Sequence, residues 1–265
     1  MYQSMRQDAI LAILKKQGYA TVHELTEALH YSTATINRDL NRMEEQGLIK
    51  RSYGGAELVK KPHHVPFPFR HNKMRIAKRH IAARAAEFVR DADTLYIDGT
   101  TTTQYIGDYL TDKKNLTVIT NNITLAASLS ELGKTAYCLG GKIVEAPSVT
   151  DGSFAGNRAV ALSADKMFFS TGGITEDGRI AVASFYASLL RDTMMRNSRE
   201  IFLLMDHEKI FYRSTGPYLS FDLTAVDYVI SDYEFEEAFK NRFPSVRFIT
   251  VKAEEKKKKR KQDTP

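Results

Sequence analysis

A short stretch near the N-terminus concentrates side chains that can donate hydrogen bonds or carry positive charge: Thr33, Thr35, Asn37, Arg38, Asn41 and Arg42. Between them, Ile36, Leu40 and Met43 recur at helical spacing, which places the polar set on the opposite, solvent-facing side. Asparagine can pair with adenine and arginine with guanine in the DNA major groove, while hydroxyls hold phosphates. The pattern favours a helix that reads base sequence. The alternative is a small helical hairpin whose polar face is merely solvated.

A second set of residues with groups that can bind a ligand follows the ends of β-rich runs. Asp98-Gly99-Thr100-Thr101-Thr102 comes directly after one such run and leads into a helical pattern. Backbone N–H groups and hydroxyls would converge there at a positive helix end, which suits a phosphate. The threonines could equally do no more than cap that helix. The run is neither a Walker loop nor a GxGxxG motif, so we expect no nucleotide and no other cofactor.

The elements that must position the first set form a winged helix-turn-helix. Thr21 caps one helix with Glu24 as its capping-box partner, and Ser32 caps the next. A two-stranded wing then closes on Gly54-Gly55. Because the second helix of such a unit enters the major groove, we predict DNA contacts from a defined set. Its members are Thr21, Ser32, Thr33, Thr35, Asn37, Arg38, Arg42, Arg51, Tyr53, Gly54 and Gly55.

Residues 6–56 resemble the DNA-binding domain of DeoR-type bacterial transcriptional regulators. The matching residues are Ser32, Thr35, Ile36, Arg38, Asp39 and Leu40, then Glu44, Gly47, Leu48 and Arg51, then Gly54, Gly55 and Ala56. Asn37 stands where the family has arginine, and Tyr53 where it has histidine. The change at position 37 predicts a different operator sequence. A competing interpretation pairs Arg38 with Asp39 or Glu44 on the protein itself.

The rest of the chain predicts a mostly parallel α/β domain, because short β-rich runs alternate with helical ones from Thr94 onward. The predicted strands are Thr94–Ile97, Leu116–Thr120, Thr135–Leu139, Met167–Ser170, Glu200–Met205, Tyr228–Ser231 and Val246–Val251. The predicted helices are Lys73–Val89, Thr102–Leu110, Ile123–Leu132, Phe185–Asn197 and Phe235–Asn241. Residues 140–166 show no clear period, which predicts loops and an irregular insertion.

Ligands of such folds bind beyond the carboxyl ends of the strands, so we expect an effector there. Its predicted contacts are Asp98, Gly99, Thr100, Thr101, Thr102, Asn121, Gly140, Gly141, Asp206 and Lys209. These groups resemble the effector domain of the same DeoR-type family, which is similar in fold to ribose-5-phosphate isomerase and the CoA transferases. The resemblance implies a repressor, less often an activator, of sugar or polyol catabolic genes that a phosphorylated sugar releases from operator DNA. Thr100 replaces the family's usual glycine, which stiffens the loop.

Charge and proline content suggest the domain boundaries. The net charge is +6, yet residues 61–84 hold seven basic side chains and no acidic one. We predict a DNA-binding domain at 1–59, a basic linker at 60–72, an effector domain at 73–251 and a basic disordered tail at 252–265. Three prolines predict extended backbone in the linker. The basic face of the helix after it either contacts phosphates or is solvated.

Composition narrows the class of protein further. The single cysteine, Cys138, excludes an internal disulfide and favours the reducing cytoplasm, and we expect it buried in a strand. No apolar run is long enough for a membrane span.

The alternative function is a sugar-phosphate isomerase-like enzyme fused to a DNA-binding module, with Asp98, Asp206 and Lys209 as its catalytic groups. We expect no enzyme, because the isomerase Asp-Gly-x-Asp-Glu segment and any metal-ligand cluster are missing. One helix-turn-helix reads few base pairs, which predicts a homo-oligomer, dimer or tetramer.

Overall fold

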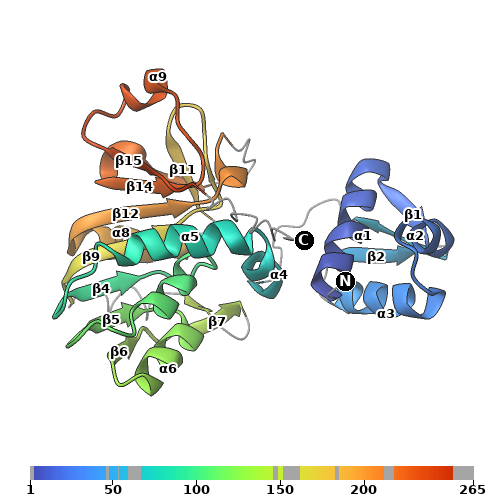
Figure 1. The fold of residues 1–265 in the computed structure, drawn as a ribbon, viewed down its shortest axis with the longest axis horizontal. Coiled ribbons are helices and arrows are strands. Elements are labelled where there is room, and N and C mark those ends of the chain that lie inside the picture. Colours follow the sequence, from blue (N-terminus) through green and yellow to red (C-terminus); the bar gives the residue numbers. More distant parts are fainter. Residues whose placement is uncertain are drawn as a thin grey trace, which may run out of the picture. The chain divides into compact units, whose positions relative to one another are not determined.

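A computed structural model describes residues 3–45, 48–52, 54–58, 67–145, 149–151, 162–182, 185–211 and 218–252. The chain divides into two compact units, Met1–Lys73 and Met74–Pro265 (Figure 1).

The first unit is the predicted winged helix-turn-helix with one additional strand. Its elements are α1 (Gln3–Gln17), β1 (Tyr19–Thr21), α2 (Val22–Leu29), α3 (Thr33–Glu45), β2 (Ile49–Ser52), β3 (Gly55–Leu58) and α4 (Phe67–Asn72). The strands form an antiparallel sheet in the order β1-β3-β2. The core gathers Ile10 and Leu14 of α1, Leu25 of α2, and Ile36 and Leu40 of α3. These apolar positions recur at helical spacing, which explains why the three helices pack around one centre.

The second unit is built on a seven-stranded sheet in the order β15-β14-β12-β9-β4-β5-β6, and every neighbouring pair in it is parallel. Its strands are β4 (Thr94–Ile97), β5 (Thr117–Thr120), β6 (Thr135–Cys138), β9 (Ala164–Ser170), β12 (Ser198–Met205), β14 (Tyr228–Ser231) and β15 (Arg247–Thr250). All seven predicted strands are present. Since all run the same way, their carboxyl ends lie at one edge of the sheet.

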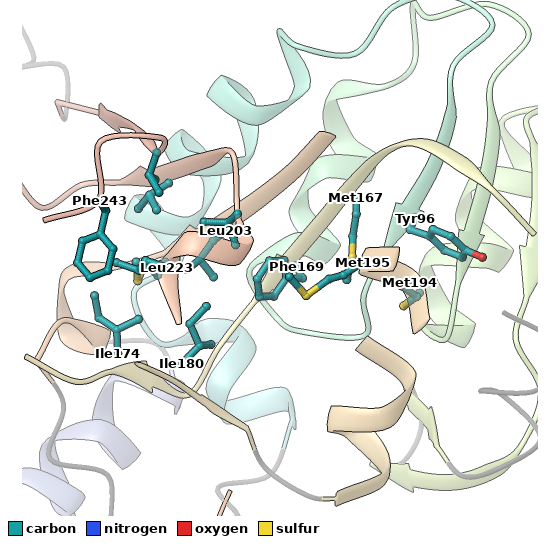
Figure 2. Packing of buried hydrophobic residues seen from close by; sticks show 14 of the residues in the cluster. Tyr96, Met167, Phe169, Ile174, Ile180, Met194, Met195, Leu203, Leu223 and Phe243 are labelled. Carbon is teal, nitrogen blue, oxygen red and sulfur yellow. The ribbon is translucent and has the colours of Figure 1, made fainter. Parts of the chain in front are cut away.

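Helices cover both faces of this sheet. On one face α5 (Arg75–Ala86) lies against β12 and β14 (Figure 1), while α6 (Ile123–Glu131) packs on β5 and β6. On the other face α8 (Phe185–Arg196) contacts β12. Successive residues of β12 alternate between the two cores: Phe202 and Leu204 join α5, and Leu203 and Met205 join α8. Figure 2 shows the core on the α8 side of the sheet, to which Phe169, Met195 and Leu203 belong.

The structure adds elements that the sequence did not predict. A hairpin of β7 (Lys142–Glu145) and β8 (Val149–Asp151) occupies part of the stretch that we expected to be loops. A second, antiparallel sheet contains β10 (Gly173–Ile174), β11 (Arg179–Val182) and β13 (Tyr218–Asp222).

The remaining short elements are the 3-10 helices η1 (Thr103–Tyr109), η2 (His207–Lys209) and η3 (Leu223–Ala225), and helix α9 (Glu237–Lys240).

Three predictions need correction. The helix expected at Thr102–Leu110 is the 3-10 helix η1, so it lacks the regular α-helical end that we expected behind the phosphate loop. Residues 67–72 of the predicted extended linker form α4, where Pro68 falls in the first turn and costs no helical hydrogen bond. Cys138 is exposed, because β6 is the edge strand and its side chains are mostly open to solvent.

Candidate functional site

Helix α3 presents a polar face to solvent. Ser32 precedes it, and Ser32, Thr33, Arg38 and Arg42 are exposed, while Ile36, Leu40 and Met43 are fully buried. The side predicted to face DNA is therefore open.

Side-chain caps fix where both helices of the motif begin. Thr21 and Glu24 form the predicted capping box at the start of α2, with Glu24 N–H donating to Thr21 Oγ1 over 3.2 Å. Ser32 Oγ accepts from Thr35 N–H over 3.3 Å at the start of α3. Between the helices His30 adopts a left-handed conformation with φ of 56°, which reverses the chain sharply. These hydroxyls thus hold the turn even before any phosphate arrives.

Arg51 of β2 lies across helix α3. Its NH2 group donates to Asn37 Oδ1 and its NH1 group to Asn41 Oδ1, both over 2.8 Å. The Arg51 backbone N–H donates to Glu44 Oε1 over 2.8 Å. The wing and α3 are therefore joined by three hydrogen bonds from one residue. Asn37 is the departure from the family pattern, and here its amide oxygen helps to position Arg51.

The protein partners suggested for Arg38 are engaged elsewhere. Asp39 is buried and forms an ion pair with Arg6 of α1. Glu44 accepts from Arg51, as described above. No hydrogen bond or ion pair of Arg38 with the described residues is present, so its guanidinium stays available on the exposed face.

The two glycines of the wing are favoured over other residues for different structural reasons. Gly54 has a φ of +76°, which L side chains rarely adopt, and nothing would crowd a Cβ there. A Cβ on Gly55 would lie 2.3 Å from Ala20 O of β1, so only glycine lets β1 and β3 approach. Tyr53, between the strands of the wing, lies outside the described residues.

At the carboxyl edge of the large sheet, Asp98 organises the loop after β4. Its Oδ1 atom accepts from the hydroxyls of Thr100 and Thr103, each over 2.7 Å. Its Oδ2 atom accepts from Ser170 N–H over 3.1 Å and faces Arg191 NH2 at 3.5 Å. Both oxygens thus serve the protein itself. Asp98 therefore holds the loop after β4 in place, and the effector contact that the sequence predicts for it stays a prediction.

Two lysines from other parts of the fold donate to successive threonines of this loop. Lys78 Nζ of α5 donates to Thr101 Oγ1 over 3.2 Å. Lys209 Nζ, at the end of η2, donates to Thr102 Oγ1 over 3.0 Å and to Ser170 Oγ over 2.9 Å. Asp206 Oδ2 lies 3.6 Å from the same ammonium group. The structure brings Thr101, Thr102, Asp206 and Lys209 of the predicted effector set close together.

Arg191 of α8 is buried beside this cluster with hydrogen-bonding capacity to spare. Its NH2 group donates to Ser170 O over 2.9 Å, yet its Nε and NH1 atoms are buried with no hydrogen-bond partner in the part of the chain that the structure describes. Burial lowers the pKa of the guanidinium, and the neighbouring Asp98 opposes that shift. Unpaired donors in a buried cation are costly, which makes them the natural partners of an anionic ligand.

The loop after β5 lies at the same carboxyl edge of the large sheet. Asn121 Nδ2 donates to Thr150 O over 2.8 Å, whereas Asn121 Oδ1 is buried and no described residue donates to it. A Cβ on Gly99 would lie 3.0 Å from that oxygen, so Gly99 allows Asn121 to approach the loop after β4. Gly140 and Gly141 follow β6 and are exposed, and a Cβ on Gly140 would meet open space. Packing therefore does not demand glycine at position 140.

The sequence analysis assigned no effector contact to Lys78, Ser170 or Arg191. Lys78 was counted within a basic helical face, but it is only 3% exposed. Its signal was present, since Lys78 lies at helical spacing with the buried Ile81, Ala82 and Ala85.

Comparison with known protein families finds one family match for the DNA-binding part of the chain and one for the α/β part. The DeoR-like helix-turn-helix domain matches residues 6–62, and the DeoR C terminal sensor domain matches residues 73–233. The chain belongs to the DeoR family. The HTH-type transcriptional repressor GlcR of Bacillus subtilis is 32% identical to this DeoR-family chain, over 90% of the chain and 92% of GlcR. The Glycerol-3-phosphate regulon repressor of Escherichia coli K12 is 30% identical over 79% of the chain and 83% of that repressor.

These relatives identify this DeoR-family member as a transcriptional regulator and not an enzyme. Among solved structures, ribose 5-phosphate isomerase from Plasmodium falciparum aligns with a TM-score of 0.39 and 14% identity, over 52% of this chain and 54% of that one. In the part of the chain that is described, no group of three or more His, Cys, Asp or Glu residues could hold a metal ion. None of the described helices is long and apolar enough to cross a membrane.

Proposed function

We propose that this regulator represses sugar or polyol catabolic genes and that a phosphorylated sugar releases it from operator DNA. The exposed face of α3 supplies the operator contacts, with Arg38 and Asn37 at the bases and Ser32, Thr33 and Thr35 at the phosphates. The effector binds at the carboxyl edge of the large sheet, in the bacterial cytoplasm.

The observation that carries the effector assignment is the cluster of three cations around the Asp98–Thr103 loop, in which Lys78 and Arg191 are buried and Lys209 is partly buried. Lys209 reaches Thr102 and Ser170, and two nitrogen atoms of the neighbouring Arg191 have no hydrogen-bond partner among the described residues. A phosphate supplies acceptor oxygens for the two Arg191 nitrogen atoms and a negative charge beside the Lys209 ammonium group. Asn121 Oδ1, to which none of the described residues donates, suits a sugar hydroxyl. The site therefore matches an anion that also carries hydroxyl groups.

Release of DNA requires the effector to prefer the arrangement of subunits that cannot bind the operator. A coupling free energy of about 1–3 kcal/mol changes operator affinity roughly 5–150-fold. The protein acts as a homo-oligomer, dimer or tetramer, because one recognition helix reads too few base pairs for a genomic operator. The relatives' names support sugar-related regulons: one is named a Glycerol-3-phosphate regulon repressor.

The test begins with a thermal-shift panel of phosphorylated sugars and polyols, with inorganic phosphate and the unphosphorylated sugars as comparisons. Operator DNA is selected from random duplexes with the purified protein, and its release is then titrated with each compound that shifts unfolding. We expect at least one sugar phosphate to stabilise the protein and release the operator. Equal action by the unphosphorylated sugar would contradict the phosphate assignment.

Lys209→Met tests the site itself. The variant should bind the selected operator as wild type does and need a much higher effector concentration for release, because it removes the ammonium group from Thr102. Lys114→Met is the matched control, since Lys114 is an exposed lysine before β5, at the opposite edge of the sheet. Release by Lys209→Met at the wild-type effector concentration would contradict this location.

A further inference from the structure

Strand β6 forms one edge of the large sheet, and no described strand pairs with its outer side. It is the last strand in the sheet order, next to β5 (Figure 1). The N–H groups of Thr135 and Leu139 donate to main-chain carbonyl oxygens on the β5 side, over 3.3 Å and 2.7 Å. Because the peptide groups of a strand alternate in direction, Ala136 and Cys138 direct their N–H and C=O groups outward.

This edge lacks the features that usually keep an exposed strand from pairing. Natural edge strands carry charged residues or proline, and β6, with the sequence Thr-Ala-Tyr-Cys, has neither. The residue before it, Lys134, is turned toward the protein, since its ammonium group donates to Thr111 O over 2.9 Å and to Lys113 O. At the opposite edge of the sheet, β15 begins with the exposed, charged Arg247. The β6 edge is therefore open to another strand.

Exposed apolar side chains lie around the same edge. Tyr137 of β6 is 52% exposed, Leu132 before the strand is 50% exposed, and Ile143 of β7 is 54% exposed. Half of the large apolar side chains that are exposed in the described part of the chain fall between residues 132 and 143. Such a group beside an uncharged strand is typical of a surface that binds another protein.

We propose that β6 pairs antiparallel with β6 of a second copy of this chain, so that the two large sheets become one. A two-fold axis perpendicular to the sheet reverses the strand direction and keeps each face of the sheet on the same side. The outward-facing groups fix the register: Ala136 lies opposite the partner's Cys138, and their N–H and C=O groups bond to one another. Tyr137 then lies on the axis, where it packs against the partner's Tyr137. A shift of two residues either way would leave Ala136 or Cys138 without a partner in the other β6.

The charges beside the strand favour a copy of the same edge as the partner. Glu131 and Leu132 precede β6, whereas Lys142 and Ile143 follow it, and all four are exposed. In the antiparallel pair the amino end of one strand lies beside the carboxyl end of the other. Glu131 therefore comes to the side of the partner's Lys142, and Leu132 to the side of the partner's Ile143. This inference rests on the proposed homo-oligomer and assigns the surface that forms it.

The mass of the full chain in solution, measured by analytical ultracentrifugation, tests the surface. Tyr137→Lys places like charges opposite each other on the axis and should reduce the mass of the wild-type assembly to about half. Ile76→Lys is the matched control, since Ile76 of α5 is 72% exposed and lies outside the β6 edge. The control should keep the wild-type mass. An unchanged mass for Tyr137→Lys would overturn the role of β6.

An engineered disulfide tests the register and does not depend on a disruptive substitution. With a mild added oxidant, Ala136→Cys should bond to the partner's Cys138 and run as a dimer on a denaturing, non-reducing gel. The Cα atoms of a hydrogen-bonded antiparallel pair lie about 5.5 Å apart, which is within disulfide range. Two controls should stay monomeric on the gel: Ala136→Cys combined with Cys138→Ser, and Thr135→Cys, whose side chain lies on the other face of the sheet.

The outcomes separate this inference from the proposed function. A cross-link by Thr135→Cys in place of Ala136→Cys would overturn the pairing described above. If wild type is heavier than the 30.0 kDa of one chain but Ala136→Cys gives no cross-link, the homo-oligomer stands and the β6 surface is wrong. Wild type that sediments as a single chain would contradict both.

Discussion

Arg51 NH2 donates a hydrogen bond of 2.8 Å to Asn37 Oδ1, which joins the wing to helix α3. Asn37 Nδ2 in turn donates to Thr33 O over 3.0 Å. Asn37 therefore has partners on both sides of its amide before DNA binds. A bidentate contact with adenine requires the amide to exchange these partners for the base, which it can do because the helix face is exposed.

Asn37→Ala should lower affinity for the selected operator by about 1–3 kcal/mol and change binding to random DNA little, because a base contact discriminates among sequences. Competition binding with both DNAs measures the difference. Asn41→Ala is the control, since Asn41 also accepts from Arg51. If the two variants lose the same affinity on both DNAs, Asn37 only positions Arg51 and reads no base.

Gly55→Ala should destabilise the first unit more than Gly54→Ala. The added Cβ at position 55 meets the backbone oxygen of Ala20 at 2.3 Å, and such overpacking costs about 1–3 kcal/mol. Position 54 has open space and only an unfavourable φ, which costs about 1 kcal/mol. Amide hydrogen exchange of β1 and β3 gives the local free energy of opening. A larger loss for Gly54→Ala would show that the wing can move away from β1.

Lys166→Met should reduce the free energy of unfolding of the second unit by about 3–5 kcal/mol, because it leaves a buried carboxylate unpaired. Lys166 is buried near the amino end of β9 and donates to Asp93 Oδ2 over 2.8 Å. The control is Arg199→Met, since the exposed Arg199 faces Asp165 at 3.4 Å, and a pair of that kind contributes only about 0–1 kcal/mol. Denaturant unfolding measures both, and similar losses would contradict the importance of burial.

The pair of His207 and Asp232 should make stability depend weakly on pH. A hydrogen bond from the His207 ring to Asp232 Oδ2, 2.6 Å long, raises the pKa of His207 above its ordinary value of 6.5. A raised folded-state pKa means that the contribution is complete below about pH 6.5 and is lost as the pH rises through the folded pKa. Because His207 is half exposed, the contribution is below about 1 kcal/mol.

Histidine NMR titration of wild type and Asp232→Asn isolates this contribution from the other histidines. The His207 pKa should return toward its ordinary value in the variant. The stability difference between the two proteins should be larger near pH 5.5 than near pH 8, since only the protonated ring is stabilised by the carboxylate. A difference that grows as the pH rises would contradict the assigned sign.

Local signals in the sequence predicted the DNA-binding unit in detail. Thr21 and Ser32 mark the two helix starts, because a cap and its helix lie within one turn of each other. The Gly54-Gly55 pair marks the wing, but the third strand β1 was missed since its three residues carry no period of their own. The structure also shows that Gly55 is fixed by its neighbour across the sheet and not by the turn.

The sequence by itself determined the parallel sheet and the strand ends after which Asp98, Asn121 and Lys209 lie, since apolar runs and their boundaries are local properties. Only the tertiary structure decided what these residues touch. Lys78 and Arg191 reach the same loop from helices on opposite faces of the sheet, more than a hundred residues apart in the chain. No short-range pattern records such a meeting, because it depends on how two helices pack against one sheet edge.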